Sequence, residues 1–236
     1  MGGKGDDELY GLEGDDIIYG QQGADRAFGG PGDDTIFLGN GFGNSGTNET
    51  KNNRGSADGD FGSGGSGNDK VYGTDARDAL FGGVGHDFLY AYSGNDHLDG
   101  GAGDDYLSAG AGRDKVIGGA GDDQIKAGGG HDDVEAGDGD DVVEAQGGDD
   151  DVYGGDGDDK VTGGKGNDDV WGGEGQDTLY GNAGSDVLRG QGGDDILVGG
   201  DDIDGTYKNQ KGTDDTEYMY GGEGSDAIFG QSGVKK

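Results

Sequence analysis

One aspartate recurs at every ninth position along most of this chain. It is Asp105 in the unit Gly100–Ser108 and Asp177 in the unit Gly172–Tyr180. A carboxylate kept at a constant place in a repeat can ligate a cation, or it can cap a turn by accepting backbone N–H hydrogen bonds. The residues around this aspartate decide between these two kinds of chemistry.

The rest of the nine-residue unit is also fixed at particular positions. The unit runs without a break over residues 64–198, and further copies fill 2–37 and 221–229. Position one is Gly or Ala, position four is Gly except at Ala76, position six is Asp, and position eight is Leu, Ile or Val except at Ala27. Positions three, five and seven accept many residue types, so we expect their side chains to face water.

This pattern predicts a turn followed by a very short strand. Glycines at fixed offsets indicate a backbone with positive φ or close packing, so we expect a turn over the first six positions. The last three positions, as in Lys160–Thr162, predict a strand whose middle side chain points inward. Such a strand is not stable alone, and stacking of successive units predicts an all-β, parallel β-solenoid.

Composition excludes several classes of function. Of 236 residues, 63 are Gly and only 28% are hydrophobic, which disfavours a conventional globular enzyme. The formal net charge is −35, so nucleic acid and anionic membranes are poor partners. The chain has no Cys and no apolar run long enough to span a bilayer.

The unit Gly-Gly-x-Gly-x-Asp-x-aliphatic-x resembles the calcium-binding nonapeptide of the repeats-in-toxin (RTX, hemolysin-type) family. The resemblance covers roughly four fifths of the chain. It implies a right-handed parallel β-roll with two nonapeptides in each coil. It also implies Ca²⁺ ions between neighbouring turns on each edge of the roll.

The resemblance implies that the position-six carboxylates are calcium ligands and that turn carbonyls complete each shell. Calcium prefers six to eight oxygen ligands, and glycine-rich turns expose carbonyls well. For an isolated copy a turn cap is the better interpretation, but acidic turns stacked about 4.8 Å apart repel one another without a cation. The expected ligands are Asp7, Asp16, Asp25, Asp34, Asp69, Asp78, Asp87, Asp96, Asp105, Asp114, Asp123, Asp132, Asp141, Asp150, Asp159, Asp168, Asp177, Asp186, Asp195 and Asp226.

The charge of the expected ions nearly balances the charge of the chain. Roughly 15 or more Ca²⁺ ions between turns would bring about +30, against a formal −35. Because the sites do not exist in an unfolded chain, we expect a chain that is disordered without calcium and folded with it.

We expect residues 1–236 to form a single β-roll with two interruptions. Residues 38–63 lack an aliphatic residue after Leu38 and predict a polar loop excursion, and residues 208–211 predict a small bulge. The turns of units Gly20–Phe28 and Gly73–Phe81 depart from the pattern. We expect their sites to bind calcium weakly or to stay empty.

No catalytic motif accompanies the repeat, and we expect a protein that is not an enzyme. His86, His97 and His131 fall at positions five, seven and five without the spacing of a zinc protease. Aromatic residues often occupy position nine, and the period predicts stacking of Tyr10 on Phe28, Tyr72 on Tyr90 and Tyr153 on Trp171. These rings either shield the sheet or contact a glycan, a protein or another copy of the chain.

The leading hypothesis is a secreted, extracellular or cell-surface structural or adhesive module that folds when it binds calcium. The alternative is the secretion and folding module of a larger exported enzyme or toxin. The segment from Met1 to Asp7 lacks a signal-peptide pattern, so we expect another export route or a fragment of a longer chain.

Overall fold

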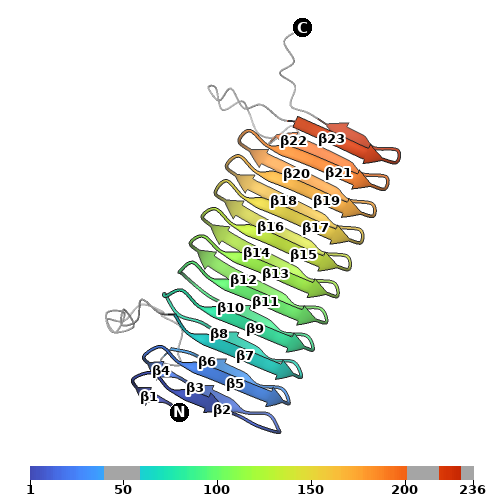
Figure 1. The fold of residues 1–236 in the computed structure, drawn as a ribbon. Coiled ribbons are helices and arrows are strands. Elements are labelled where there is room, and N and C mark those ends of the chain that lie inside the picture. The colour runs from blue at the N-terminus through green and yellow to red at the C-terminus, as the bar shows by residue number, and fades with distance from the viewer. Residues whose placement is uncertain (40–58, 201–217, 230–236) are drawn as a thin grey trace, which may run out of the picture.

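Two parallel β-sheets face each other along the length of the molecule (Figure 1). The computed structural model describes residues 1–39, 59–200 and 218–229, and every regular element in these ranges is a β-strand. The all-β, parallel β-solenoid predicted from the repeat is confirmed. The described part of the chain contains no helix that could cross a membrane.

Each sheet has 11 strands, and consecutive strands along the chain alternate between the two sheets. A short third sheet pairs β1 (Gly3–Lys4) with β4 (Gln21–Gln22) at the N-terminal end. The first large sheet contains β3 (Ile17–Tyr19), β6 (Thr35–Phe37), β8 (Lys70–Tyr72), β10 (Phe88–Tyr90), β12 (Tyr106–Ala111), β14 (Gln124–Gly129), β16 (Val142–Gly147), β18 (Lys160–Lys165), β20 (Thr178–Ala183), β22 (Ile196–Gly200) and β24 (Ala227–Phe229). The second contains β2 (Glu8–Tyr10), β5 (Arg26–Pro31), β7 (Phe61–Ser66), β9 (Ala79–Val84), β11 (His97–Ala102), β13 (Lys115–Ala120), β15 (Asp133–Asp138), β17 (Asp151–Asp156), β19 (Asp169–Glu174), β21 (Val187–Gly192) and β23 (Tyr218–Glu223).

The register between strands follows the repeat. Leu89 of β10 pairs with Leu107 of β12, which pairs in turn with Ile125 of β14. Each of these steps advances the chain by two nine-residue units, so one coil of the solenoid contains two units. Equivalent residues of every second unit therefore lie in one row along the solenoid axis.

The hydrophobic core is a narrow row of position-eight side chains. Leu98, Leu107, Val116 and Ile125 are fully buried, and they alternate between the two sheets. Position seven and position nine flank each of them and point outward, because neighbouring side chains of a strand lie on opposite faces. The aliphatic residue of each unit therefore packs against the same position of the neighbouring units.

The strands are longer than the three residues expected from the sequence. In the central coils they span six residues, as in β11 (His97–Ala102), and include the first three positions of the following unit. The pairing skips position one and resumes at position two, where Gly101 has a φ of 106°. The small residue at position one and the positive φ at position two let the backbone bend and rejoin the sheet.

The coil also includes both ends of the segment 38–63, which the sequence analysis assigns to a polar excursion. Leu38 is fully buried, and β7 pairs with both β5 and β9. Gly62 takes position eight in this coil, and a Cβ there would lie 2.7 Å from Cγ1 of Val71 and 3.3 Å from Cδ1 of Leu38. These two neighbouring side chains fill the core where the unit lacks an aliphatic residue. Residues 40–58 of the excursion and the bulge at 208–211 lie outside the described residues.

The single-file core makes each aliphatic residue important for stability. We predict that Leu107→Ala lowers the free energy of unfolding by about 2–5 kcal/mol, since it leaves a cavity that the flanking coils fill only in part. Ser108→Ala, on the outward face of the same strand, should change it by less than about 0.5 kcal/mol. Chemical denaturation in saturating calcium, followed by circular dichroism, measures both. Equal effects of the two substitutions would contradict the single-file core.

Candidate metal centres

The position-six aspartates lie buried at the two edges of the solenoid, where the chain turns from one sheet to the other. Asp105 is 3% exposed and Asp123 is 2% exposed. A charged carboxylate is rarely buried unless it is paired or bound to a metal. Each of these side chains therefore needs a partner.

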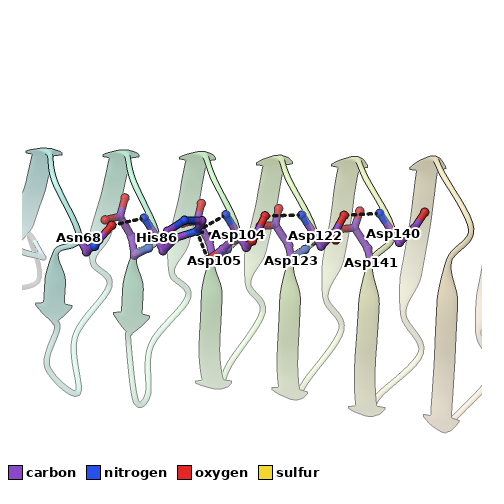
Figure 2. A network of polar contacts seen from close by, with 9 residues as sticks. Asn68, His86, Asp104, Asp105, Asp122, Asp123, Asp140 and Asp141 are labelled. Carbon is purple, nitrogen blue, oxygen red and sulfur yellow. Dashed lines mark hydrogen bonds and ion pairs between the residues drawn. The ribbon is translucent and has the colours of Figure 1, made fainter.

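One carboxylate oxygen, Oδ1, accepts a hydrogen bond from the preceding coil. The N–H of Asp105 donates to Oδ1 of Asp123 at 2.8 Å, and the N–H of Asp123 donates to Oδ1 of Asp141 at 2.7 Å (Figure 2). These bonds connect neighbouring coils and do not cap the turn that carries the carboxylate. At these positions the carboxylate therefore accepts a bond from another coil and does not cap its own turn.

The bonds form one continuous row on each edge. One row contains Asp7, Asp25, Asp60, Asp78, Asp96, Asp114, Asp132, Asp150, Asp168 and Asp186. The other contains Asp16, Asp34, Asp69, Asp87, Asp105, Asp123, Asp141, Asp159, Asp177, Asp195 and Asp226. The structure thus brings together every aspartate predicted from the repeat.

Asp60 belongs to the first row and was missed as a candidate ligand. Its Oδ1 accepts the N–H of Asp25, and its own N–H donates to Oδ1 of Asp78. The spacing of 18 residues from Asp78 was the available signal. Asp60 was missed because its unit has Gly62 at position eight in place of an aliphatic residue. Leu38 and Val71 fill the core there.

The second carboxylate oxygen, Oδ2, is buried and has no hydrogen-bond partner along most of both rows. A buried polar atom without a partner is costly, and its repetition in coil after coil indicates a place for a ligand. This holds in the described chain for Asp7, Asp16, Asp25, Asp34, Asp69, Asp87, Asp96, Asp105, Asp114, Asp123, Asp132, Asp141, Asp150, Asp159, Asp168, Asp177 and Asp195.

In several turns Oδ2 lies near a main-chain carbonyl oxygen of the next coil. A Cβ placed on Gly100 would lie 2.5 Å from Oδ2 of Asp105 and 2.6 Å from the carbonyl oxygen of Gly118. Where Ala109 takes position one instead of Gly, its side chain joins the core, and Oδ2 of Asp114 is likewise without a partner. The turns therefore offer carboxylate and carbonyl oxygens, which is the donor set that calcium prefers.

In the described ranges, no three acidic or histidine side chains gather at one point that could hold a metal. This agrees with the geometry of the rows, since the turns offer single carboxylates together with main-chain oxygens. Calcium accepts main-chain carbonyls as well as carboxylates, so clustered acids are not required for it. It differs in this respect from zinc centres built from several side chains.

Burial strongly perturbs the carboxyl groups when no cation is present. It raises the pKa of Asp123 to about 7, with smaller contributions from the charges of Asp105, Asp104 and Asp122, while the N–H of Asp105 opposes the shift. Burial likewise raises the pKa of Asp96 to about 8. The ionised rows are thus unfavourable without a compensating positive charge.

A second row of hydrogen bonds runs along the turns at position five. The N–H of Asp122 donates to Oδ1 of Asp104 at 3.0 Å, and the N–H of Asp140 donates to Oδ1 of Asp122 at 3.0 Å (Figure 2). His86 joins this row, accepting at Nδ1 from the N–H of Asp104 at 2.8 Å and donating its own N–H to Oδ1 of Asn68.

The side chains at position five are exposed, as expected, but many of them also accept a hydrogen bond from another coil, which was not expected. These side chains accept the position-five N–H of the following coil, in the direction opposite to the bonds of the position-six rows. The frequency of Asp, Asn and His at position five was the signal that could have predicted this, since these side chains can accept such a bond.

The turn at residues 73–78 is built differently from the others. Oδ2 of Asp78 accepts the N–H of Thr74 at 2.6 Å and the Thr74 hydroxyl at 3.1 Å. The turn of unit Gly20–Phe28 also departs from the repeat in sequence, yet Oδ2 of Asp25 remains without a partner. The geometry thus distinguishes the first of these two degenerate turns from its neighbours but not the second.

Comparison with known proteins agrees with this geometry. A family model for the RTX calcium-binding nonapeptide repeat matches residues 1–27, 11–44, 54–89, 81–116, 108–143, 144–179, 171–205 and 211–234. No curated protein matches the chain at significant similarity. Because the family model covers most of the chain, including the turns that carry the buried aspartates, the protein belongs to the RTX calcium-binding nonapeptide repeat family and forms a calcium-binding β-roll.

Proposed function

We propose that calcium binds at the turns through Oδ2 of the position-six aspartates and that this binding drives the chain to fold. The observation that supports the proposal is the buried Oδ2 that lacks a partner in coil after coil. Calcium supplies positive charge and accepts further oxygen ligands. Main-chain carbonyls such as that of Gly118, beside Oδ2 of Asp105, complete the shell.

Folding depends on calcium because the same rows that build the coil also repel one another. The formal charge of the chain is −35, and the rows hold carboxylates one coil apart at each edge. In the unfolded chain the turns are not assembled, so the free energy of calcium binding contributes directly to folding. About 15 or more bound ions would neutralise most of the charge.

A chain with this behaviour fits a place outside the cell, where calcium is abundant. It would remain extended during export and become a rigid rod after release, which suits a secreted structural or adhesive module. A chain that folds in this way would also serve as the secretion and folding module of a larger exported enzyme or toxin, which is the alternative that the family resemblance raises.

The histidines support a structural role without catalysis. His86 and His131 each accept a backbone N–H of the next coil at Nδ1. His97 packs edge-on against Phe81, with ring centroids 5.5 Å apart. All three therefore have a place in the coil itself.

The aromatic residues of position nine form stacks along the sheets. The three predicted stacks are confirmed: Tyr10 lies on Phe28, Tyr72 on Tyr90 and Tyr153 on Trp171, with ring centroids 5.1, 5.6 and 4.3 Å apart. Rings stacked this closely cover one another's faces and leave mainly their edges for a partner. This arrangement favours shielding of the sheet over a platform on which a glycan stacks.

Replacing the ligating oxygen of a single turn tests the proposed site. Asp123→Asn keeps Oδ1 for the N–H of Asp105 but replaces the charged Oδ2 with an amide group. We predict that the calcium concentration at the folding midpoint rises about three- to tenfold, as expected for the loss of one charged ligand. Circular dichroism during calcium titration, with magnesium as a reference, measures the midpoint.

Asp122→Asn is the matched control for this substitution. It removes the same charge from the neighbouring position, and its amide oxygen can still accept the N–H of Asp140. The midpoint should then shift less than twofold, since only a solvated charge is lost. Equal shifts for the two variants would contradict ligation by Oδ2, and a spectrum rich in β-sheet under excess chelator at pH 8 would contradict calcium-driven folding.

Protons should partly replace calcium. The raised pKa values of buried residues such as Asp96 (about 8) and Asp123 (about 7), against an ordinary value of 3.8, mean that the calcium-free coil binds more protons than the unfolded chain between about pH 4 and 8. Its free energy of unfolding therefore falls as the pH rises through this range. We predict more β-sheet at pH 5 than at pH 8 in excess chelator.

The same pH series in calcium is the companion measurement. Protons compete with calcium for the carboxylates, so the calcium midpoint should rise as the pH falls. A calcium-free chain whose β-sheet content increased from pH 5 to pH 8 would contradict the inferred burial of the carboxyl groups.

A further inference from the structure

The turn at residues 73–78 lacks the backbone conformation of the other turns. Gly83 and Gly85, at positions two and four of the following unit, have φ values of 120° and 140°. Thr74 and Ala76 occupy the same positions of their own unit, and neither has a positive φ. A β-branched residue strongly disfavours that region, so the sequence forces a different turn here.

This different turn places hydrogen-bond donors where the other turns have none. The N–H of Thr74 lies 2.6 Å from Oδ2 of Asp78, and the Thr74 hydroxyl lies 3.1 Å from the same oxygen. The N–H of Ala76 donates in turn to the Thr74 hydroxyl at 3.2 Å. Oδ2 of Asp78 is therefore satisfied by its own turn.

The carboxylate of Asp78 is also bonded to the adjacent coil. Asp60 precedes Asp78 in the same row, and its N–H donates to Oδ1 of Asp78 at 2.8 Å. Burial raises the pKa of Asp60 to about 7, so the row is unfavourable in its ionised form here as well. Thr74 is itself 6% exposed, so its hydroxyl lies buried beside the carboxylate of Asp78.

We propose that Thr74 takes the place of calcium between Asp60 and Asp78, so that this step of the row holds no ion. The proposal rests on the proposed function, since it concerns which turns bind calcium. To ligate an ion, Asp78 must give up these hydrogen bonds, and both donors lie within hydrogen-bond distance of the oxygen that the ion needs. Thr74 thus determines that its turn does not bind calcium.

The surroundings of this turn favour a coil without metal. Arg77 is a fixed positive charge in the turn, and it lowers the pKa of Asp96 in the next coil against the larger effect of burial. Phe61 packs against both Phe28 and Phe81, with ring centroids 5.3 Å apart in each pair. These contacts hold the adjacent strands β5, β7 and β9 together where the ion does not.

Restoring the glycines of the repeat tests the inference. The double substitution Thr74→Gly and Ala76→Gly removes the hydroxyl and permits positive φ at both positions. Native mass spectrometry of the full chain in excess calcium counts the bound ions, and we expect one more ion than in the unsubstituted protein. The single substitution Thr74→Gly is a milder second variant with the same expected gain.

Thr162→Gly is the control, because Thr162 lies outside the turns on strand β18, and its loss should leave the count unchanged. Circular dichroism in calcium verifies that each variant is folded. An unchanged count in both folded Thr74 variants would overturn the inference and leave calcium binding at the other turns intact. An unsubstituted protein that binds no calcium would overturn the proposed function itself.

Discussion

The main constraint on this structure is that the buried carboxylates in its turns need a partner. The core is a single row of aliphatic side chains, and the strands on either side are held mainly by backbone hydrogen bonds. A core this thin contributes little apolar burial to offset the ordering of a chain with 63 glycines. The rows of aspartate add repulsion, which the proposed cation at the turns would remove.

Each of these aspartates serves two purposes with its two oxygens. Oδ1 of Asp123 connects its coil to the preceding one, while its Oδ2 lies in the turn without a partner. Bonding between coils and the proposed ligation are therefore compatible in this fold, because they use different oxygens of one carboxylate. At Asp78 the second oxygen bonds to its own turn, and this requires the different backbone that Thr74 imposes.

Much of the fold could be predicted from the sequence because the repeat fixes which side chain points inward. The core row through Leu107 and the aspartate rows follow directly from the nine-residue period. Where the pattern failed, neighbouring coils supplied what the unit lacked: Leu38 and Val71 fill the core above Gly62, so residues 59–63 stay in the coil. The sequence of a single unit does not show that side chains of neighbouring coils can fill its part of the core.

The position-five row was missed for a different reason. Its residue types vary, but Asp104, His86 and Asn68 share the ability to accept one backbone N–H. Conservation of a hydrogen-bonding capacity is less visible in a sequence than conservation of a residue. The structure reveals it because the accepting atoms of Asn68, His86 and Asp104 occupy equivalent places in successive coils.

The cohesion of the solenoid differs along its axis. Near the N-terminal end, rings such as Phe37, Tyr72 and Tyr90 stack on the outer face of one sheet, with centroids 4.9 and 5.6 Å apart, and each stacked pair contributes about 0.5–1.5 kcal/mol. Further along, the outward row pairs Asp133 with Asp151 and Asp151 with Asp169 across β15, β17 and β19. Burial raises the pKa of Asp151, and the charges of Asp169 and Asp133 raise it further. Like charges on the sheet face thus add to those in the turns. Under the proposed calcium-driven folding, we therefore expect the middle coils to depend most on calcium and the coils around Thr74 to depend on it least.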